Sequence, residues 1–186
     1  KNKIRHIVIE ENFPNIKTDE NGFVQYVEKD GNKSFIFLDT NLADTDAGHL
    51  CDKRQQWLRE NLDKEQKNKI YIFMHHNPLA IGHINSDCIG LVQREDLKKI
   101  LLQYQNSIQH IFFGHQHVTS SGKYLDITFS SPRSTWSPLV PNFLDRYRLG
   151  TANTDPNYNI VLLEEDSLIV HSEDFLKTDV NWFTDN

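Results

Sequence analysis

The sequence has 186 residues, a length that suits a single domain (residues 1–186) able to bury about 70% of the surface of its unfolded chain. Its net charge is −6 and it has no stripe of basic residues, so neither nucleic acid nor an anionic membrane is an expected partner. No apolar stretch approaches the roughly 18 residues that span a bilayer. The two cysteines, Cys51 and Cys88, are too few for a disulfide framework and fit a reducing compartment, so we expect a cytoplasmic protein.

The first part of the chain predicts a β-hairpin followed by a helix. Residues 23–27 and 34–38 are apolar runs, and the turn signal Asp30-Gly31 lies between them. The second run is apolar at successive positions, which is expected of a strand that is covered on both faces. Residues 52–62 then have the spacing of an amphipathic helix.

Two further strands each lead into a pair of histidines. The apolar strand 70–74 runs directly into His75-His76-Asn77-Pro78. A helix is predicted over residues 93–104, and the next strand, 108–113, leads into Gly114-His115-Gln116-His117. This alternation of strands and helices indicates an α/β domain.

The last third of the chain has a different pattern. Residues 124–129 predict a short strand, residues 130–138 predict a loop, and residues 139–157 show no clear periodicity. Residues 158–163 and 167–171 predict a closing hairpin across an acidic turn.

The two histidine pairs suggest a metal site. The carboxyl ends of strands in an open α/β sheet lie at one edge, where ligands bind. On an extended backbone His115 and His117 would point the same way, so both rings could face one cavity. Three imidazoles can hold one divalent ion or contribute to two. A glycine and two histidines alone fit a surface loop equally well.

The two motifs together resemble those of the calcineurin-like metallophosphoesterases. Within that family, residues 72–79 are most similar to the class III cyclic-nucleotide phosphodiesterases and the bacterial glycerophosphodiesterases. The resemblance runs from about Phe35 to Val170. Its weaker matches are Phe37-Leu38-Asp39-Thr40, Trp57-Leu58 and Pro156-Asn157-Tyr158-Asn159-Ile160-Val161. Asn77 stands where the subfamily usually has proline.

The resemblance implies a set of metal ligands. His75 and His115 are expected to bind one ion and His117 the second, the metals being Mn, Fe, Zn or Co. The candidates for the substrate pocket are His76, His83 and Arg133. No residue of this chain is assigned a catalytic role.

Three further motifs of the family, D-x-H, G-D-x-x-D and G-N-H-D/E, do not occur in this sequence. The chain begins at Lys1 and its only methionine is Met74. We therefore expect the carboxyl-terminal half of a metallophosphoesterase αββα sandwich, with a mixed sheet flanked by helices. A half-domain should leave apolar surface uncovered, so a homodimer is also expected.

The expected function is hydrolysis of a small phosphodiester, a cyclic nucleotide or a glycerophosphodiester, at a two-metal site that a missing amino-terminal half completes. The fragment alone should show little or no catalysis. Two alternatives stay open: a phosphomonoesterase of the same fold, and an inactive interaction module.

Overall fold

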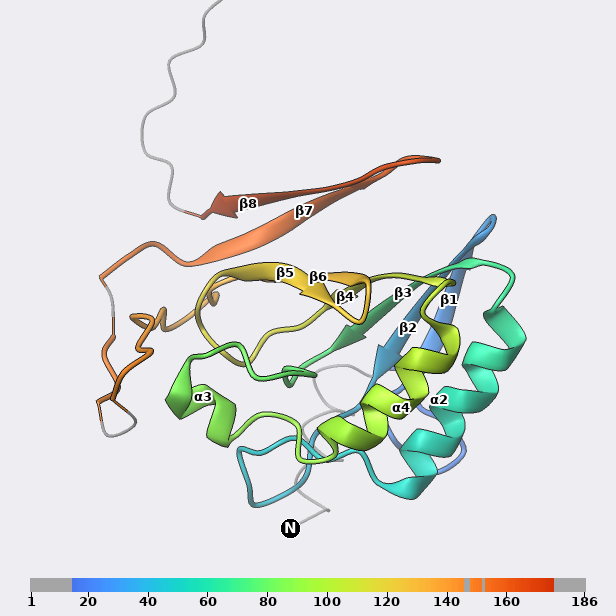
Figure 1. Ribbon diagram of the computed structural model, residues 1–186, viewed down its shortest axis with the longest axis horizontal. Helices are drawn as coiled ribbons and strands as arrows, with labels where there is room; N and C mark the ends of the chain where they lie inside the picture. Colours follow the sequence, from blue (N-terminus) through green and yellow to red (C-terminus); the bar gives the residue numbers. More distant parts are fainter. Residues whose placement is uncertain (1–14, 146–147, 152, 176–186) are drawn as a thin grey trace, which may run out of the picture.

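The computed structural model describes residues 15–145, 148–151 and 153–175, and a six-stranded mixed sheet forms its centre (Figure 1). The strand order is β1-β2-β3-β4-β6-β5. The strands are β1 (Tyr26–Asp30), β2 (Lys33–Leu38), β3 (Lys69–Met74), β4 (Ile108–Phe112), β5 (Ser120–Tyr124) and β6 (Ile127–Ser131). β2, β3, β4 and β6 run parallel, and β1 and β5 pair antiparallel at the two edges. The carboxyl ends of the four parallel strands therefore lie at one edge of the sheet.

Two helices, α2 (Asp52–Glu65) and α4 (Arg94–Tyr104), lie side by side on one face of the sheet (Figure 1). Their leucine and isoleucine side chains pack on the alternate residues of the central strands that face them. The largest fully buried members of this core are Ile36, Leu58, Leu62, Ile70, Ile72, Leu97, Ile100, Leu101 and Ile111. In the part of the chain that the structure describes, none of the helices combines the length and apolar character of a bilayer-spanning segment. The predicted α/β class, with a mixed sheet and flanking helices, is confirmed.

The opposite face of the sheet carries a row of stacked aromatic rings. Tyr26, Phe37, Phe73 and Phe112 occupy the same register position on four adjacent strands. Their successive ring centroids are 4.6, 4.8 and 4.7 Å apart. These contacts lock the register of the strands that lead to the histidines.

A separate hairpin, β7 (Asn157–Leu163) and β8 (Leu168–Asp174), lies across the sheet from the two helices (Figure 1). The predicted closing hairpin is thus confirmed, with a longer second strand. One of its faces exposes Tyr158, Ile160, Leu162 and Ile169, which are between 38% and 46% exposed.

The strand predicted over residues 124–129 is confirmed for residues 127–129, which belong to β6, but its start is wrong. The chain instead makes a two-residue turn at Leu125 and Asp126, which separates β5 from β6. Both turn residues have positive φ, 54° and 64°. This backbone matches the twist of a tight hairpin, but it usually requires glycine or asparagine, so the sequence carries only a weak signal for it. The short helix α3 (Ile84–Cys88) lies between β3 and α4.

Candidate metal centre

The histidines that follow β3 and β4 lie next to each other. His75 and His76 come directly after β3, and His115 comes three residues after β4. Because β3 and β4 are parallel neighbours, both strands deliver their histidines to the same edge of the sheet. A backbone hydrogen bond from Gly114 N to the His75 carbonyl, 3.0 Å long, joins the two segments.

The rings of His75 and His115 face each other. Nε2 of His75 lies 3.1 Å from Nδ1 of His115, whose other ring nitrogen, Nε2, lies 3.0 Å from the carbonyl oxygen of Ile89. A carbonyl oxygen only accepts, so Nε2 of His115 carries the proton and Nδ1 directs its lone pair toward His75. The Ile89 carbonyl thereby selects the tautomer of His115.

Both rings are neutral at pH 7. The His75 residue is exposed, but the atoms packed around its ring partly desolvate it, and this desolvation, together with the nearby His115 and His117, lowers the pKa of His75 from 6.5 to about 4. Burial also lowers the pKa of His115, against the opposing effect of its hydrogen bond to Ile89. Because neutral imidazole is the form that binds metal, the site holds these side chains in a binding-competent state.

His76 lies on the buried side of the same edge and is 2% exposed. Its Nδ1 is 2.8 Å from Oγ1 of Thr40, and its Nε2 is 3.1 Å from the carbonyl oxygen of Asp46. The carbonyl requires the proton on Nε2, so the Thr40 hydroxyl donates to Nδ1. Gly48 packs against the ring: a Cβ there would lie 2.6 Å from Cβ of His76. Donor atoms of His75, His76 and His115 all lie within 4.8 Å of one another, but both nitrogens of His76 already have partners.

His117 presents its ring differently from the expected arrangement. His115 and His117 both have positive φ, 70° and 53°, so the segment is not in the extended conformation that would point both rings the same way. Nδ1 of His117 lies 2.7 Å from the carbonyl oxygen of Ser137, which places its proton there and leaves Nε2 as the acceptor. Its charged form would lower the pKa of both His75 and His115, so it lies within electrostatic range of them.

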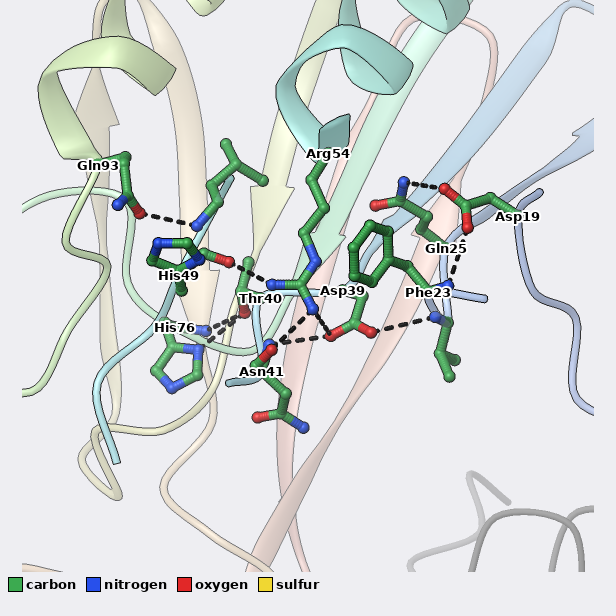
Figure 2. Close-up of polar contacts among 12 residues, drawn as sticks. Asp19, Phe23, Gln25, Asp39, Thr40, Asn41, His49, Arg54, His76 and Gln93 are labelled. Carbon is green, nitrogen blue, oxygen red and sulfur yellow. Dashed lines mark hydrogen bonds and ion pairs between the residues drawn. The ribbon is translucent and has the colours of Figure 1, made fainter. Parts of the chain in front are cut away.

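A buried ion pair supports the segment that holds His76 (Figure 2). Arg54 approaches Asp39 at 3.3 Å, and each side chain is 3% exposed. Arg54 also donates to the carbonyls of His49 and Asn41, each at 2.7 Å. Asp39 and Asn41 flank Thr40, so Arg54 fixes the backbone from which the Thr40 hydroxyl reaches His76.

The other two candidates for the substrate pocket are engaged elsewhere. His83 is fully buried, and its Nδ1 lies 2.6 Å from Oγ of Ser86. The guanidinium of Arg133 forms an ion pair with Asp174 of β8. Arg133 follows β6 at the same edge of the sheet as the histidines, whereas the His83 side chain has no surface open to solvent.

Sequence reasoning missed the groups that orient the histidines. The carbonyls of Ile89 and Ser137 are backbone atoms, which carry no sequence signal. Thr40 and Gly48 were visible in the sequence, but nothing local to them indicates contact with a ring about 30 residues away. Only the pairing of β2 with β3 brings them together.

The chain is similar to a known protein family and to solved structures. The model of the family "Calcineurin-like phosphoesterase" matches residues 3–119, which is more than half of the chain. The chain belongs to this family of metal-dependent hydrolases. Membership of this family implies divalent metal ions at the site.

Several individual proteins are similar. A probable cyclic nucleotide phosphodiesterase of Rhodopseudomonas palustris is 25% identical over 167 residues, which cover 88% of this chain and 61% of that protein. A glycerophosphodiester phosphodiesterase of Enterobacter lignolyticus is 28% identical over 112 residues, covering 60% of this chain and 40% of that protein. The crystal structure of a dimetal phosphatase from Danio rerio superimposes with a TM-score of 0.64 at 13% identity, over 93% of this chain and 66% of that one, and shows the fold. This chain thus spans less than two thirds of the length of the relatives that it matches.

Proposed function

We propose that this chain provides the histidine side of a dinuclear metal site, in a protein that hydrolyses small phosphodiesters such as a cyclic nucleotide or a glycerophosphodiester. His75 and His115 bind one ion and His117 binds the other. Carboxylate ligands from outside these 186 residues complete the site. The names of the relatives support a diester substrate.

The observation that carries the proposal is the 3.1 Å separation between Nε2 of His75 and Nδ1 of His115. Two nitrogens bound to one ion at about 2.1 Å lie about 3.0 to 3.4 Å apart, for octahedral and tetrahedral angles respectively. The observed separation therefore fits a shared ion with little movement. The carbonyls of Ile89 and Ser137 already set the tautomers in which His115 and His117 offer a lone pair.

The roles of the residues follow from these contacts. When bound, the two divalent ions supply Lewis-acid activation of the attacking water and of the phosphoryl oxygens. His75, His115 and His117 hold the ions and do not act as general bases. His76 keeps its hydrogen bonds to Thr40 and Asp46 and maintains the shape of the edge.

Metal content measured by elemental analysis, on protein purified without chelator, tests the proposal. His75→Ala and His115→Ala should each lose the first ion, and His117→Ala should retain it. His171→Ala changes an exposed histidine of β8 and is the matched control. Equal metal content in all four variants would refute the ligand assignment.

Activity separates the diester proposal from its alternatives. For the 186-residue chain alone we expect weak metal binding and little or no hydrolysis, because the described cluster contains three histidines and no carboxylate. In a protein that contains this chain and the three absent motifs, a diester substrate should be hydrolysed faster than the matched monoester. The reverse preference would support a phosphomonoesterase, and stoichiometric metal without hydrolysis of either substrate would support an inactive module.

A further inference from the structure

The side chains of Asn77 and Gln116 form a buried pair, which we call the amide clasp. Both residues are 0% exposed, and Nε2 of Gln116 donates to Oδ1 of Asn77. Nδ2 of Asn77 donates to the carbonyl of Leu79 at 2.6 Å and to Oδ1 of Asp87 at 3.1 Å. Because both of these partners only accept, the orientation of the Asn77 amide is fixed, and its oxygen must face Gln116.

The clasp connects the two segments that carry the histidines. Asn77 lies two residues after His75, and Gln116 lies between His115 and His117. Together with the backbone bond between Gly114 and His75 and the contact between the His75 and His115 rings, the clasp ties these two segments together. Since the clasp is fully buried, water does not replace the bond when it is broken.

Gln116 also lies in a constrained part of the backbone. His115 and His117, on either side of it, have φ values of 70° and 53°. Such conformations cost about 1 kcal/mol or more for each non-glycine residue, and they persist only where surrounding contacts impose them. Two such contacts come from Gln116. Its side chain is buried, and its backbone N–H donates to the carbonyl oxygen of Gly114 at 2.8 Å.

The segment between α3 and α4 closes around the clasp. Leu91 N donates to the Asn77 carbonyl at 3.4 Å, and Ile89 in the same segment orients His115. A Cβ at Gly90 would overlap Oδ1 of Asn77. One short stretch of chain therefore contacts both the clasp and a facing histidine, so a shift of the clasp would move that histidine.

We propose that Asn77 and Gln116 are positioning residues, which set the distance between the His75 and His115 rings and so the affinity of the site for metal. The proposal rests on the proposed function in one respect, that these two rings bind an ion. The proposal concerns Asn77, which stands where the related subfamily usually has proline. Unlike proline, Asn77 has an amide side chain that hydrogen-bonds to Gln116.

The first test is a cobalt titration of the 186-residue chain, in which visible absorption reports both affinity and coordination. Asn77→Ala and Gln116→Ala should each weaken Co²⁺ binding about tenfold, the lower end of the effect of residues that orient metal ligands. The Co²⁺ affinity of the double variant should lie within about twofold of that of the weaker single variant, because both changes break the same contact. Gln25→Ala is the control: Gln25 is 1% exposed and, like Gln116, has an Oε1 without a hydrogen-bond partner among the described residues.

The second test needs no metal. Hydrogen exchange at the Gly114 amide, which donates to His75, should be at least tenfold faster in the clasp variants than in Gln25→Ala. The proposed function would be overturned if Co²⁺ does not bind the unmutated chain, or if binding survives His75→Ala. The exchange rate at Gly114 would then be the test of whether the clasp holds the two segments together.

Three outcomes would overturn the proposal that the clasp positions the histidines. One is an unchanged exchange rate at Gly114. Another is a Co²⁺ affinity in both variants equal to that of Gln25→Ala, and a third is a fully additive loss in the double variant. Gln116→Met, which keeps the length of the side chain without its amide, covers the case in which alanine prevents folding. If that variant also fails to fold, the pair serves the fold and not the site, which overturns the inference as well.

Discussion

Replacement of Arg54 by methionine should destabilise the protein strongly. The change removes the cation 3.3 Å from Asp39, two hydrogen bonds to backbone carbonyls, and a guanidinium 4.2 Å from the ring centroid of Phe23. Loss of one partner from a buried ion pair costs about 3–5 kcal/mol, because the remaining charge stays buried. Asp39 still accepts from the backbone N–H of Val24 and Asn41, so we expect about 3 kcal/mol, the lower end of that range.

Urea unfolding followed by far-UV circular dichroism gives the free energy of unfolding. Arg59→Met, on the same helix, removes a single hydrogen bond of 3.3 Å near the surface and should cost less than about 1 kcal/mol. In a variant that combines Arg54→Met with Asp39→Asn, part of the loss should be recovered, because no charge is then left buried. If Arg54→Met costs no more than Arg59→Met, the ion pair does not stabilise the edge of the sheet and the reasoning fails.

Two other expectations concern packing and pH. Gly48→Ala should lower the free energy of unfolding by about 1–3 kcal/mol, because its Cβ would lie 2.7 Å from Nδ1 of His76. Gly150→Ala, where the Cβ would meet Val140 at 3.5 Å, should be nearly neutral in the same urea unfolding assay. Burial lowers the pKa of His110 from 6.5 to about 4. Between about pH 4 and pH 6.5, His110 is therefore protonated in the unfolded chain and neutral in the native state. The stability due to neutral His110 is therefore complete above about pH 6.5 and is lost as the pH falls toward 4, and His110→Asn should flatten this part of the stability curve. An identical slope in the variant and the unmutated protein would contradict the assignment.

The pattern of apolar residues was sufficient to predict most of the fold. The strand at 70–74 and the helix at 93–104 were each found to within about one residue, because one is a continuous apolar run and the other has clear helical spacing. The turn at Leu125 and Asp126 was missed because positive φ there involves neither glycine nor asparagine. That conformation depends on the pairing of β5 with β6, which local sequence does not encode.

The sequence by itself determined that histidines follow two buried strands, and the resemblance of their motifs pointed to a family that the comparisons confirm. Only the tertiary structure decided which ring atoms meet. The 3.1 Å approach of His75 to His115, the carbonyl that selects each tautomer, and the amide clasp beneath them all join residues that are far apart in the chain. The physical reason is that apolar periodicity specifies which face of an element is buried, whereas hydrogen-bond partners depend on strand order and loop conformation.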